Sequence, residues 1–458
     1  DLRGRTGYNP IKVSAAYFCQ DAFLNQLGVS PTFNLLTSVM DDMRPENKYL
    51  HLMDEQEAIT KAQALLNRPG DANVSPLAVY RHAAKADSVQ QRRPNVVLIM
   101  MESMSAKFMK HFGQSETLTP FLDSLYTRSI SFRNFYSAGI HTNHGLYATL
   151  YSFPAMMKRN LMKGSVIPRY SGLPTVLKEN GYYNLFFMTH EGQYDNMNAF
   201  FRTNGYDEVF SQEDYPVDKV VNSFGVQDDF LYDYAIPVLN QRAATGQPFF
   251  ATLLSISNHP PYVIPPFFHP KTSEPEMQIV EYADWALRQF FEEARKQPWF
   301  DNTIFVLEGD HGKLVGDAEC ELPESYNHIP LMIYSSRIQP EEKTAFGGQV
   351  DIQPTILGLL NIDYLQNNFG VDLLKEERPC MFYTADNMVV GRNDTLLYLY
   401  NYETQQELTY DIGNGKLNAV PMDDSFFPLK EYSFSMLQSA EFLVKHGKTL
   451  NSIPFTQQ

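Results

Sequence analysis

The stretch Val96-Val97-Leu98-Ile99-Met100, which follows Pro94, is apolar at every position. A strand buried on both faces of a sheet has this pattern, whereas a half-exposed strand alternates apolar and polar residues. The stretch therefore predicts a central strand of a parallel sheet, and we place the start of a core domain at residue 94.

Four further apolar stretches repeat this pattern along the chain, at Tyr183–Met188, Phe249–Ser255, Thr303–Leu307 and Leu331–Tyr334. Segments with helical character lie between them, notably 173–180, which Gly181 closes, and 281–295. Strands that alternate with helices indicate an α/β/α sandwich around a mostly parallel sheet. We assign residues 94–375 to this core domain.

Residues 1–93 resemble a helical arm followed by a linker rather than part of a sheet. Asp54 and Glu57 have the spacing of a helix start, and Pro69-Gly70 ends the predicted helix. Apolar residues lie between them at helical spacing, at Ala58, Ile59, Ala62, Leu65 and Leu66. The polar stretch 71–93 is expected to be a linker with a short helix.

Residues 376–458 have the composition of a small β-rich subdomain. Two strands are expected at 395–400 and 407–412, on either side of a turn. A terminal helix is predicted from Tyr432 to His446, with Gly447 as its C-terminal cap.

Composition limits the classes of function. The chain has 458 residues, 43% of them hydrophobic, and a formal net charge of -16. This charge argues against nucleic acid as a partner, because binding to phosphates needs clustered Lys and Arg. Phosphate or sulfate chemistry would need a local positive centre such as a metal ion.

The cysteine content and the hydropathy of the sequence do not identify the cellular compartment of the protein. Cys19, Cys320 and Cys380 are too few for a disulfide framework, and one disulfide or three unpaired thiols are both open. No apolar run approaches the ~20 residues that span a bilayer, and the sequence opens with Asp1 rather than an initiator Met. We expect any membrane anchor to lie in segments absent from this chain.

Candidate metal ligands follow two of the predicted strands. Glu102 comes directly after the first apolar stretch, and Asp310-His311 follows the stretch that ends at Leu307. Open α/β sheets bind ligands beyond the carboxyl ends of their strands, and carboxylate and imidazole groups are good ligands for divalent metals. The alternatives are a helix-capping glutamate and an ordinary turn. Glu308 is either a supporting residue or a structural acid.

Thr142 is the candidate nucleophile. It lies in the loop 138–145, just before a helix-like segment at 146–150. A hydroxyl at a helix N-terminus lies beside unpaired backbone N–H groups, which would receive the anion that it attacks. The alternative is that Thr142 simply caps the helix. His259, in the Pro-rich loop 255–262, is a candidate for substrate binding or proton transfer.

The ordered set of these motifs resembles the lipoteichoic acid synthase and phosphoglycerol transferase family, a sulfatase-like branch of the alkaline phosphatase superfamily. Further similarity lies in Thr119-Pro120-Phe121-Leu122, Asn204-Gly205-Tyr206-Asp207 and Asn327-His328-Ile329-Pro330. The resemblance implies one divalent metal, Mn²⁺ or Mg²⁺ with Zn²⁺ possible, held by Glu102, Thr142, Asp310 and His311. It also implies a substrate contact from His259, and we take His190, His328 and Arg202 as further candidates for substrate binding.

By the same resemblance, the chain would move a phosphoglycerol-like headgroup from a phospholipid donor to a glycan or lipid acceptor through a phospho-Thr142 intermediate. This would take place at the extracytoplasmic face of the cell membrane. Alternatives are a phosphoethanolamine transferase, a phosphodiesterase or sulfatase-like hydrolase, and a non-catalytic binding module. The nearest histidine after His311 is His328, which is farther along than the zinc-dependent phosphoethanolamine transferases would place it.

Two departures from the family pattern affect the prediction. The segment Glu191–Asn198 after His190 lacks the arginine with which family members bind the substrate phosphate, and Arg202 is the nearest one. Thr142 is neither Cys nor Ser, the residues that sulfatases convert to formylglycine. The second departure argues against sulfatase activity.

Overall fold

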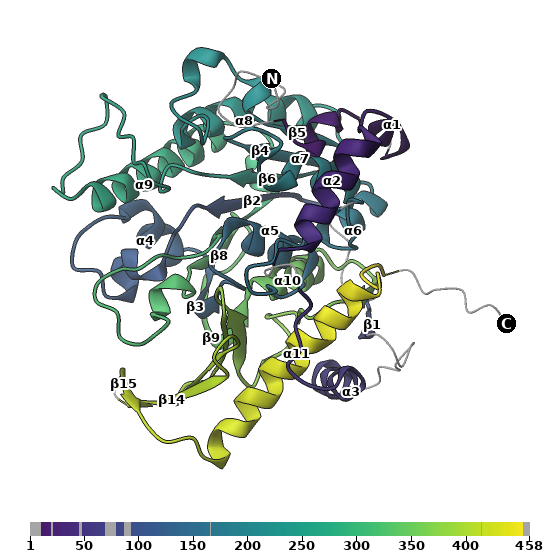
Figure 1. The fold of residues 1–458 in the computed structure, drawn as a ribbon. Coiled ribbons are helices and arrows are strands. Elements are labelled where there is room, and N and C mark those ends of the chain that lie inside the picture. Colours follow the sequence, from purple (N-terminus) through teal and green to yellow (C-terminus); the bar gives the residue numbers. More distant parts are fainter. Residues whose placement is uncertain are drawn as a thin grey trace.

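The computed structural model describes residues 11–19, 22–44, 48–68, 79–86, 93–164, 166–413 and 415–451. Its centre is a large sheet with helices on both faces, and a smaller sheet and a long terminal helix lie at one end (Figure 1). The architecture is the α/β/α sandwich that the apolar stretches predict.

The central sheet has eight strands in the order β5-β4-β6-β2-β7-β8-β3-β9. β8 runs antiparallel to both of its neighbours, and the other pairings are parallel. The strands are β2 (Asn95–Met101), β3 (Ile130–Tyr136), β4 (Tyr183–Met188), β5 (Glu208–Phe210), β6 (Phe249–Leu254), β7 (Thr303–Gly309), β8 (Leu331–Tyr334) and β9 (Glu341–Gly348). All five predicted strands are confirmed.

Helices cover both faces of this sheet. One face packs against α4 (Pro120–Tyr126), α8 (Asp228–Ala243) and α9 (Pro275–Ala294), and the other against α5 (Thr142–Tyr151), α6 (Leu173–Glu179), α7 (Met197–Thr203) and α10 (Ile352–Leu359). Alternate residues of β2 enter the two cores, with Val96 and Leu98 on one side and Val97 and Ile99 on the other. Burial on both faces explains why this strand is apolar throughout.

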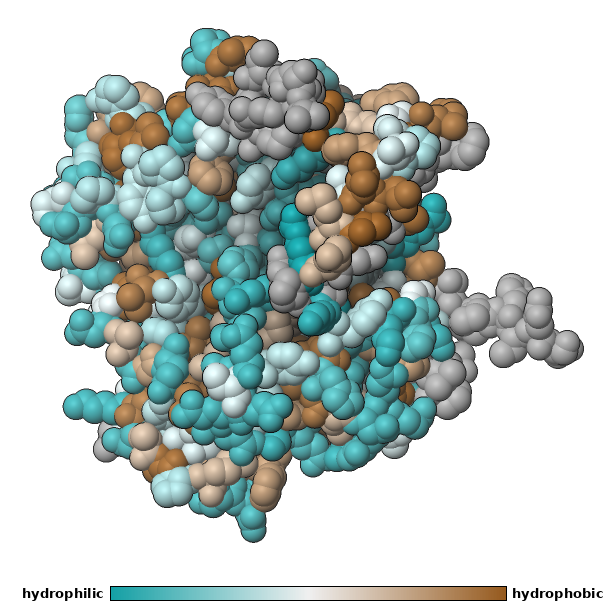
Figure 2. All heavy atoms as spheres, in the orientation of Figure 1, coloured by the Kyte–Doolittle hydropathy of each residue, from teal (hydrophilic) through white to brown (hydrophobic). Residues whose placement is uncertain are grey.

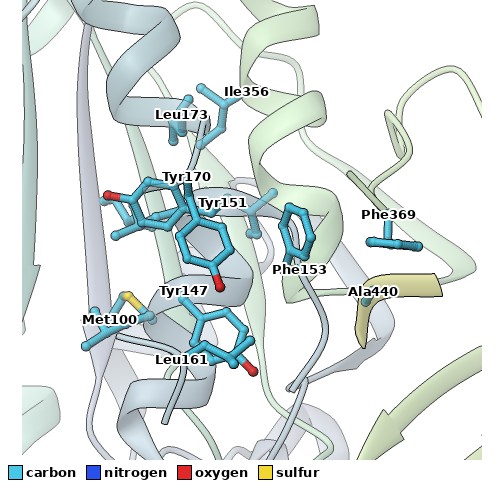
Figure 3. Close-up of a cluster of buried hydrophobic side chains, with 14 of the residues drawn as sticks. Met100, Tyr147, Tyr151, Phe153, Leu161, Tyr170, Leu173, Ile356, Phe369 and Ala440 are labelled. Atoms are coloured by element: carbon cyan, nitrogen blue, oxygen red, sulfur yellow. The ribbon is translucent and has the colours of Figure 1, made fainter. Parts of the chain in front are cut away.

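An aromatic cluster fixes α5 against the rest of the domain (Figure 3). Tyr147 and Tyr151 are fully buried, and their hydroxyl groups donate to the carbonyl oxygens of Pro154 (2.9 Å) and Asn204 (2.8 Å). A buried tyrosine needs such a partner for its hydroxyl. The position of α5, and with it the position of Thr142, is therefore set by satisfied core contacts.

The C-terminal subdomain contains a five-stranded antiparallel sheet and α11 (Phe427–Lys445). Its strands are β11 (Met381–Thr384), β12 (Met388–Arg392), β13 (Leu396–Asn401), β14 (Gln406–Gly413) and β15 (Lys416–Ala419). Both predicted strands and the terminal helix are present, although α11 begins at Phe427 rather than Tyr432. Gly447 follows the helix with a positive φ of 62°, as expected for a C-terminal cap.

The N-terminal region contains α1 (Ala22–Leu27), α2 (Pro31–Asp42) and α3 (Glu55–Leu66). The Asp54 side chain accepts a hydrogen bond from the backbone N–H of Glu57 (2.9 Å), so the predicted helix start is confirmed. α3 packs along α11, as Figure 1 also shows. Pro69-Gly70, the predicted end of the helix, lies outside the described residues.

The prediction that no part of residues 1–93 joins a sheet is wrong. β1 (Tyr80–Ala83) pairs antiparallel with β10 (Tyr364–Asn367), where a linker with a short helix was expected. The Arg81 guanidinium is buried and donates to the carbonyl oxygens of Asn368 (2.8 Å) and Gly370 (2.9 Å). β1 forms only by pairing with β10, which is distant in the sequence, so the local sequence pattern does not reveal it. Residues 71–78 and 87–92 lie outside the described residues.

The face of the molecule that Figure 2 shows is mostly polar, but apolar side chains gather on α2. Leu35, Leu36, Val39 and Met40 are all exposed. Within the described ranges, no helix combines the length and hydropathy that crossing a membrane requires. No disulfide links the three cysteines, all of which the structure describes.

Candidate metal centre

Three potential metal ligands meet at one edge of the central sheet. Glu102 follows β2, and Asp310 and His311 follow its parallel neighbour β7, so the two carboxyl strand ends lie side by side. One ligand atom from each residue lies within 4.8 Å of the others. His311 Nε2 is 3.9 Å from Glu102 Oε1 and 3.6 Å from Asp310 Oδ2. The structure thus brings together three of the four predicted ligands.

Surrounding hydrogen bonds orient these groups. Asp310 Oδ1 accepts from the backbone N–H groups of Ser103 (2.8 Å) and His311 (2.7 Å), whereas Oδ2 is buried with no hydrogen-bond partner. His311 Nδ1 lies 2.7 Å from the carbonyl oxygen of Gly312, which assigns the ring proton to Nδ1. One carboxylate oxygen and Nε2 are therefore left to bind a ligand.

The electrostatics fit a divalent cation. Burial and the neighbouring Asp310 carboxylate raise the pKa of Glu102 well above its usual range. Across the part of the chain that the structure describes, His311 is the only basic side chain that pairs with either carboxylate. Two buried carboxylates without Lys or Arg, an unpartnered oxygen and an imidazole nitrogen form a donor set suited to one divalent metal.

Thr142 lies beside this cluster. It is the first residue of α5, and the residue at the N-cap position is His141, so the Thr142 hydroxyl is not the cap of the helix. Thr142 Oγ1 donates to Glu102 Oε2 across 3.4 Å. The hydroxyl therefore lies at a helix N-terminus and against a candidate metal ligand, which are the two conditions that favour a nucleophile.

Two residues that the sequence did not single out hold α5 and the Asp310 loop together. Gly145 lies so close to this loop that a Cβ at its position would collide with the carbonyl oxygen of Asp310. Gln349 is fully buried; its Nε2 donates to the Asp310 carbonyl oxygen (2.8 Å) and its Oε1 accepts from the Ala138 N–H (2.8 Å). The nucleophile loop and the ligand loop are thus fixed to each other.

His259 and His190 follow β6 and β4, at the same edge of the sheet. The His259 ring packs on Phe224, with ring centroids 4.0 Å apart, and its Nδ1 lies 2.6 Å from the Pro260 carbonyl oxygen. Burial, and to a smaller extent the charge of His311, lower the pKa of His259. His190 is buried against Tyr194, and burial lowers its pKa as well.

Lys313 is a further basic residue at this edge. Its Nζ donates to Asn258 Oδ1 (2.6 Å) and to the Tyr262 hydroxyl (3.1 Å), and burial lowers its pKa to about 8. The Asn258 amide in turn donates to the carbonyl oxygens of Glu102 and Ser103, both at 3.2 Å. The only sequence signal for Lys313 is its place in the loop that follows His311.

The two remaining predicted substrate residues make structural contacts. His328 Nε2 lies 2.8 Å from the Arg133 carbonyl oxygen, and its ring stacks on Tyr136. The Arg202 guanidinium binds Asn198 Oδ1 through Nε (2.8 Å). The proposed contacts of these two residues with substrate stay a prediction. Glu308 accepts from Thr149 Oγ1 (2.6 Å), which fits a structural acid.

The family model described as Sulfatase matches residues 94–362. The chain belongs to the sulfatase family. Its sequence is similar to two proteins of Bacillus subtilis. Lipoteichoic acid synthase 1 is 25% identical over 350 residues, which cover 70% of this chain and 53% of the relative. Lipoteichoic acid synthase 2 is 24% identical over 315 residues, which cover 62% of this chain and 47% of the relative. This sulfatase-family chain thus spans about half the length of these relatives.

Solved structures of the superfamily have the same fold. An alkaline phosphatase superfamily protein from Vibrio parahaemolyticus aligns with a TM-score of 0.77 and 26% identity, covering 88% of this chain and 98% of that one. The lipoteichoic acid synthase LtaP from Listeria monocytogenes aligns with a TM-score of 0.68 and 19% identity, covering 85% and 98%. The predicted family resemblance and fold class are confirmed.

Proposed function

We propose that this sulfatase-family chain is a metal-dependent phosphotransferase that moves a phosphoglycerol-like headgroup from a phospholipid to a glycan or lipid acceptor through a phospho-Thr142 intermediate. The observation that carries the proposal is the contact between Thr142 Oγ1 and Glu102 at the three-ligand cluster. The similarity to proteins named lipoteichoic acid synthases supports the substrate class.

In the first step, Thr142 Oγ1 attacks the phosphorus of the donor. A Thr142 O–P bond forms, and the P–O bond to the lipid alcohol breaks. Thr142 loses its hydroxyl proton, and the departing lipid oxygen takes up one proton to become an alcohol. Glu102, Asp310 and His311 would hold the metal, which would lower the hydroxyl pKa of Thr142 and shield the charge on the phosphoryl oxygens. The unpaired backbone N–H groups at the start of α5 would face the same negative charge on the phosphoryl oxygens.

In the second step, the acceptor hydroxyl attacks the phospho-Thr142 phosphorus. The new O–P bond replaces the Thr142 O–P bond, and the acceptor proton passes to the Thr142 oxygen. His259 is suited to carry it, because the contact of Nδ1 with the Pro260 carbonyl oxygen leaves Nε2 of the neutral ring as the proton acceptor. His190 would contact the substrate from the neighbouring strand end.

A lipid donor implies that the site works next to a membrane, and the similarity to lipoteichoic acid synthases supports the extracytoplasmic face of the cell. The exposed apolar residues of α2 support this setting, because a soluble surface seldom gathers such side chains unless another phase or molecule covers them. The membrane anchor itself would belong to segments outside this chain.

Intact-mass measurement of the manganese-loaded chain after incubation with phosphatidylglycerol tests the proposal. We expect a covalent phosphoglycerol adduct that maps to Thr142 and is absent from Thr142→Val. Addition of a glycan or lipid acceptor should remove the adduct and label the acceptor, whereas a hydrolase would release glycerol phosphate alone. A metal-loaded wild-type chain that turns over the donor with the label on another residue would refute the phospho-Thr142 route.

A further inference from the structure

Lys313 is a largely buried cation whose hydrogen-bond partners are both neutral. Its ammonium group donates to the Asn258 amide oxygen and to the Tyr262 hydroxyl. It also lies over the rings of Tyr262 (4.8 Å from the centroid) and Phe108 (5.4 Å). Among the described residues, no carboxylate oxygen lies within 4.0 Å of Nζ; the ion pairs of the structure involve other lysines.

A buried ammonium group without an anion is costly. Transfer of a charge from water into the protein interior is unfavourable unless a counter-ion compensates it. The contacts with the rings of Tyr262 and Phe108 recover only part of this cost. An arrangement of this kind beside a candidate metal site indicates that the missing anion is a ligand.

A purely structural role does not explain Lys313. Asn258, its strongest partner, is already held through its own amide nitrogen, which donates to the carbonyl oxygens of Glu102 and Ser103. Asn258 is also almost fully buried. A neutral side chain could therefore fill the position of Lys313 without releasing Asn258.

The formal charges of the site lead to the same conclusion. The carboxylates of Glu102 and Asp310 balance a divalent metal, and His311 is neutral when Nε2 is a ligand. Lys313 then adds one positive charge; Glu276 is a further carboxylate that acts on it, but over more than ion-pair distance. A phosphodiester carries one negative charge, so it would neutralise the complete site.

We propose that Lys313 binds a non-bridging phosphoryl oxygen of the substrate and supplies the cation that segment Glu191–Asn198 lacks. The identity of the substrate rests on the proposed function, but the anion site itself does not. Lys313 reaches the site from the loop after β7, whereas the arginine was expected after β4. The positive charge that binds the phosphate would thus come from the end of β7 instead of the end of β4.

Calorimetric titration of the manganese-loaded chain with inorganic phosphate, and separately with dimethyl phosphate, tests this assignment without any turnover. Lys313→Met should weaken the binding of both anions by about tenfold or more, because it removes a charge-assisted hydrogen bond. Lys313→Arg should retain binding within about threefold. Lys296→Met is the matched control, since it removes an exposed, ion-paired lysine at the opposite edge of the sheet, and it should change nothing.

Manganese content and melting temperature are measured for every variant. If Lys313→Met binds either anion as tightly as wild type, or if the metal-loaded wild type binds neither, the assignment is wrong. A folded Lys313→Met chain that has lost its metal would place Lys313 in the metal centre and would also overturn it. If anion binding depends on Lys313 but no adduct forms on Thr142, the anion site stands and the proposed function fails.

Discussion

Thr142 and Glu102 are separated by 40 residues in the sequence, yet their side chains meet, with Oγ1 3.4 Å from Oε2. Glu102 directly follows the central strand β2, and Thr142 begins the helix that packs over the same sheet edge. The contact connects the proposed nucleophile to the proposed metal ligand directly. Because the hydroxyl would react and the carboxylate would hold the metal, substitutions at the two residues should separate the chemistry from metal binding.

Thr142→Val should reduce turnover by about 10³-fold or more while the fold and the metal content stay unchanged. Valine keeps the shape of threonine but lacks the hydroxyl group, and the structure shows that this hydroxyl does not cap α5. Activity, elemental analysis and melting temperature are measured together. Thr142→Ser should keep measurable activity, and activity of Thr142→Val within about tenfold of wild type would show that the hydroxyl is not the nucleophile.

The purified chain should bind about one equivalent of divalent metal, because the described residues supply one cluster of ligands. Asp310→Asn should lower the metal occupancy, since it removes the charge of a carboxylate whose Oδ2 lacks any other partner. Asp386→Asn alters an exposed carboxylate that pairs with His141, and it serves as the control. Two equivalents of zinc bound with equal affinity would instead favour a two-metal centre.

Gly145→Ala should lower metal affinity and activity together. The added methyl group would collide with the Asp310 carbonyl oxygen, and the backbone that carries this ligand would have to move. Metal titration followed by an activity assay at saturating metal measures the two effects. Gly246→Ala provides a control with a glycine whose Cβ would meet open space, although its positive φ adds some strain of its own. Unchanged metal affinity in Gly145→Ala would show that α5 does not position the ligand loop.

The rate should fall at acid pH through the titration of His259. Burial lowers the pKa of this histidine below its usual value, so the neutral, proton-accepting ring is present at neutral pH and is lost as the pH falls through that lowered pKa. His259→Ala should reduce the rate by roughly 10²-fold and remove this acid limb. Metal content should not change. A variant that lost its metal would identify His259 as a ligand.

Arg378→Met should destabilise the whole chain by about 3–5 kcal/mol, because it leaves the fully buried Asp351 carboxylate without its counter-ion. Arg378 Nε binds Asp351 Oδ2 at 2.9 Å, and Nη1 binds the Tyr432 hydroxyl of α11 at 2.7 Å. Chemical denaturation measures the loss. Lys375→Met, which removes a largely exposed partner of Asp372, should cost about 1 kcal/mol or less.

Strands buried on both faces could be predicted from the sequence, whereas the edge strand β9 and its neighbour β3 could not. β2, β4, β6, β7 and β8 are nearly continuous apolar runs. β3 is interrupted by Arg133 and Asn134, which face outward, and β9 begins with exposed glutamates. Such strands are defined by the neighbour to which they bind, and this information is absent from a local window.

The metal ligands could be predicted because they follow strands that the sequence marks clearly. Gln349 and Lys313 could not, since each acts through contacts with residues distant in the chain. Nothing in the residues around Gln349 indicates that its amide joins Ala138 to Asp310. Metal ligands can be recognised from their residue type and their place after a strand, whereas the residues that orient them are recognised only once tertiary contacts are known.

The pairing of β1 with β10 bears on where the chain can be shortened. The family match begins at residue 94, but a protein cut there would lose β1, and with it the Arg81 guanidinium that saturates two buried carbonyl groups after β10. It would also expose the face of α11 that α3 covers. We therefore expect the segment that the family model matches to be unstable by itself, and a stable form of the domain to extend upstream far enough to include α3.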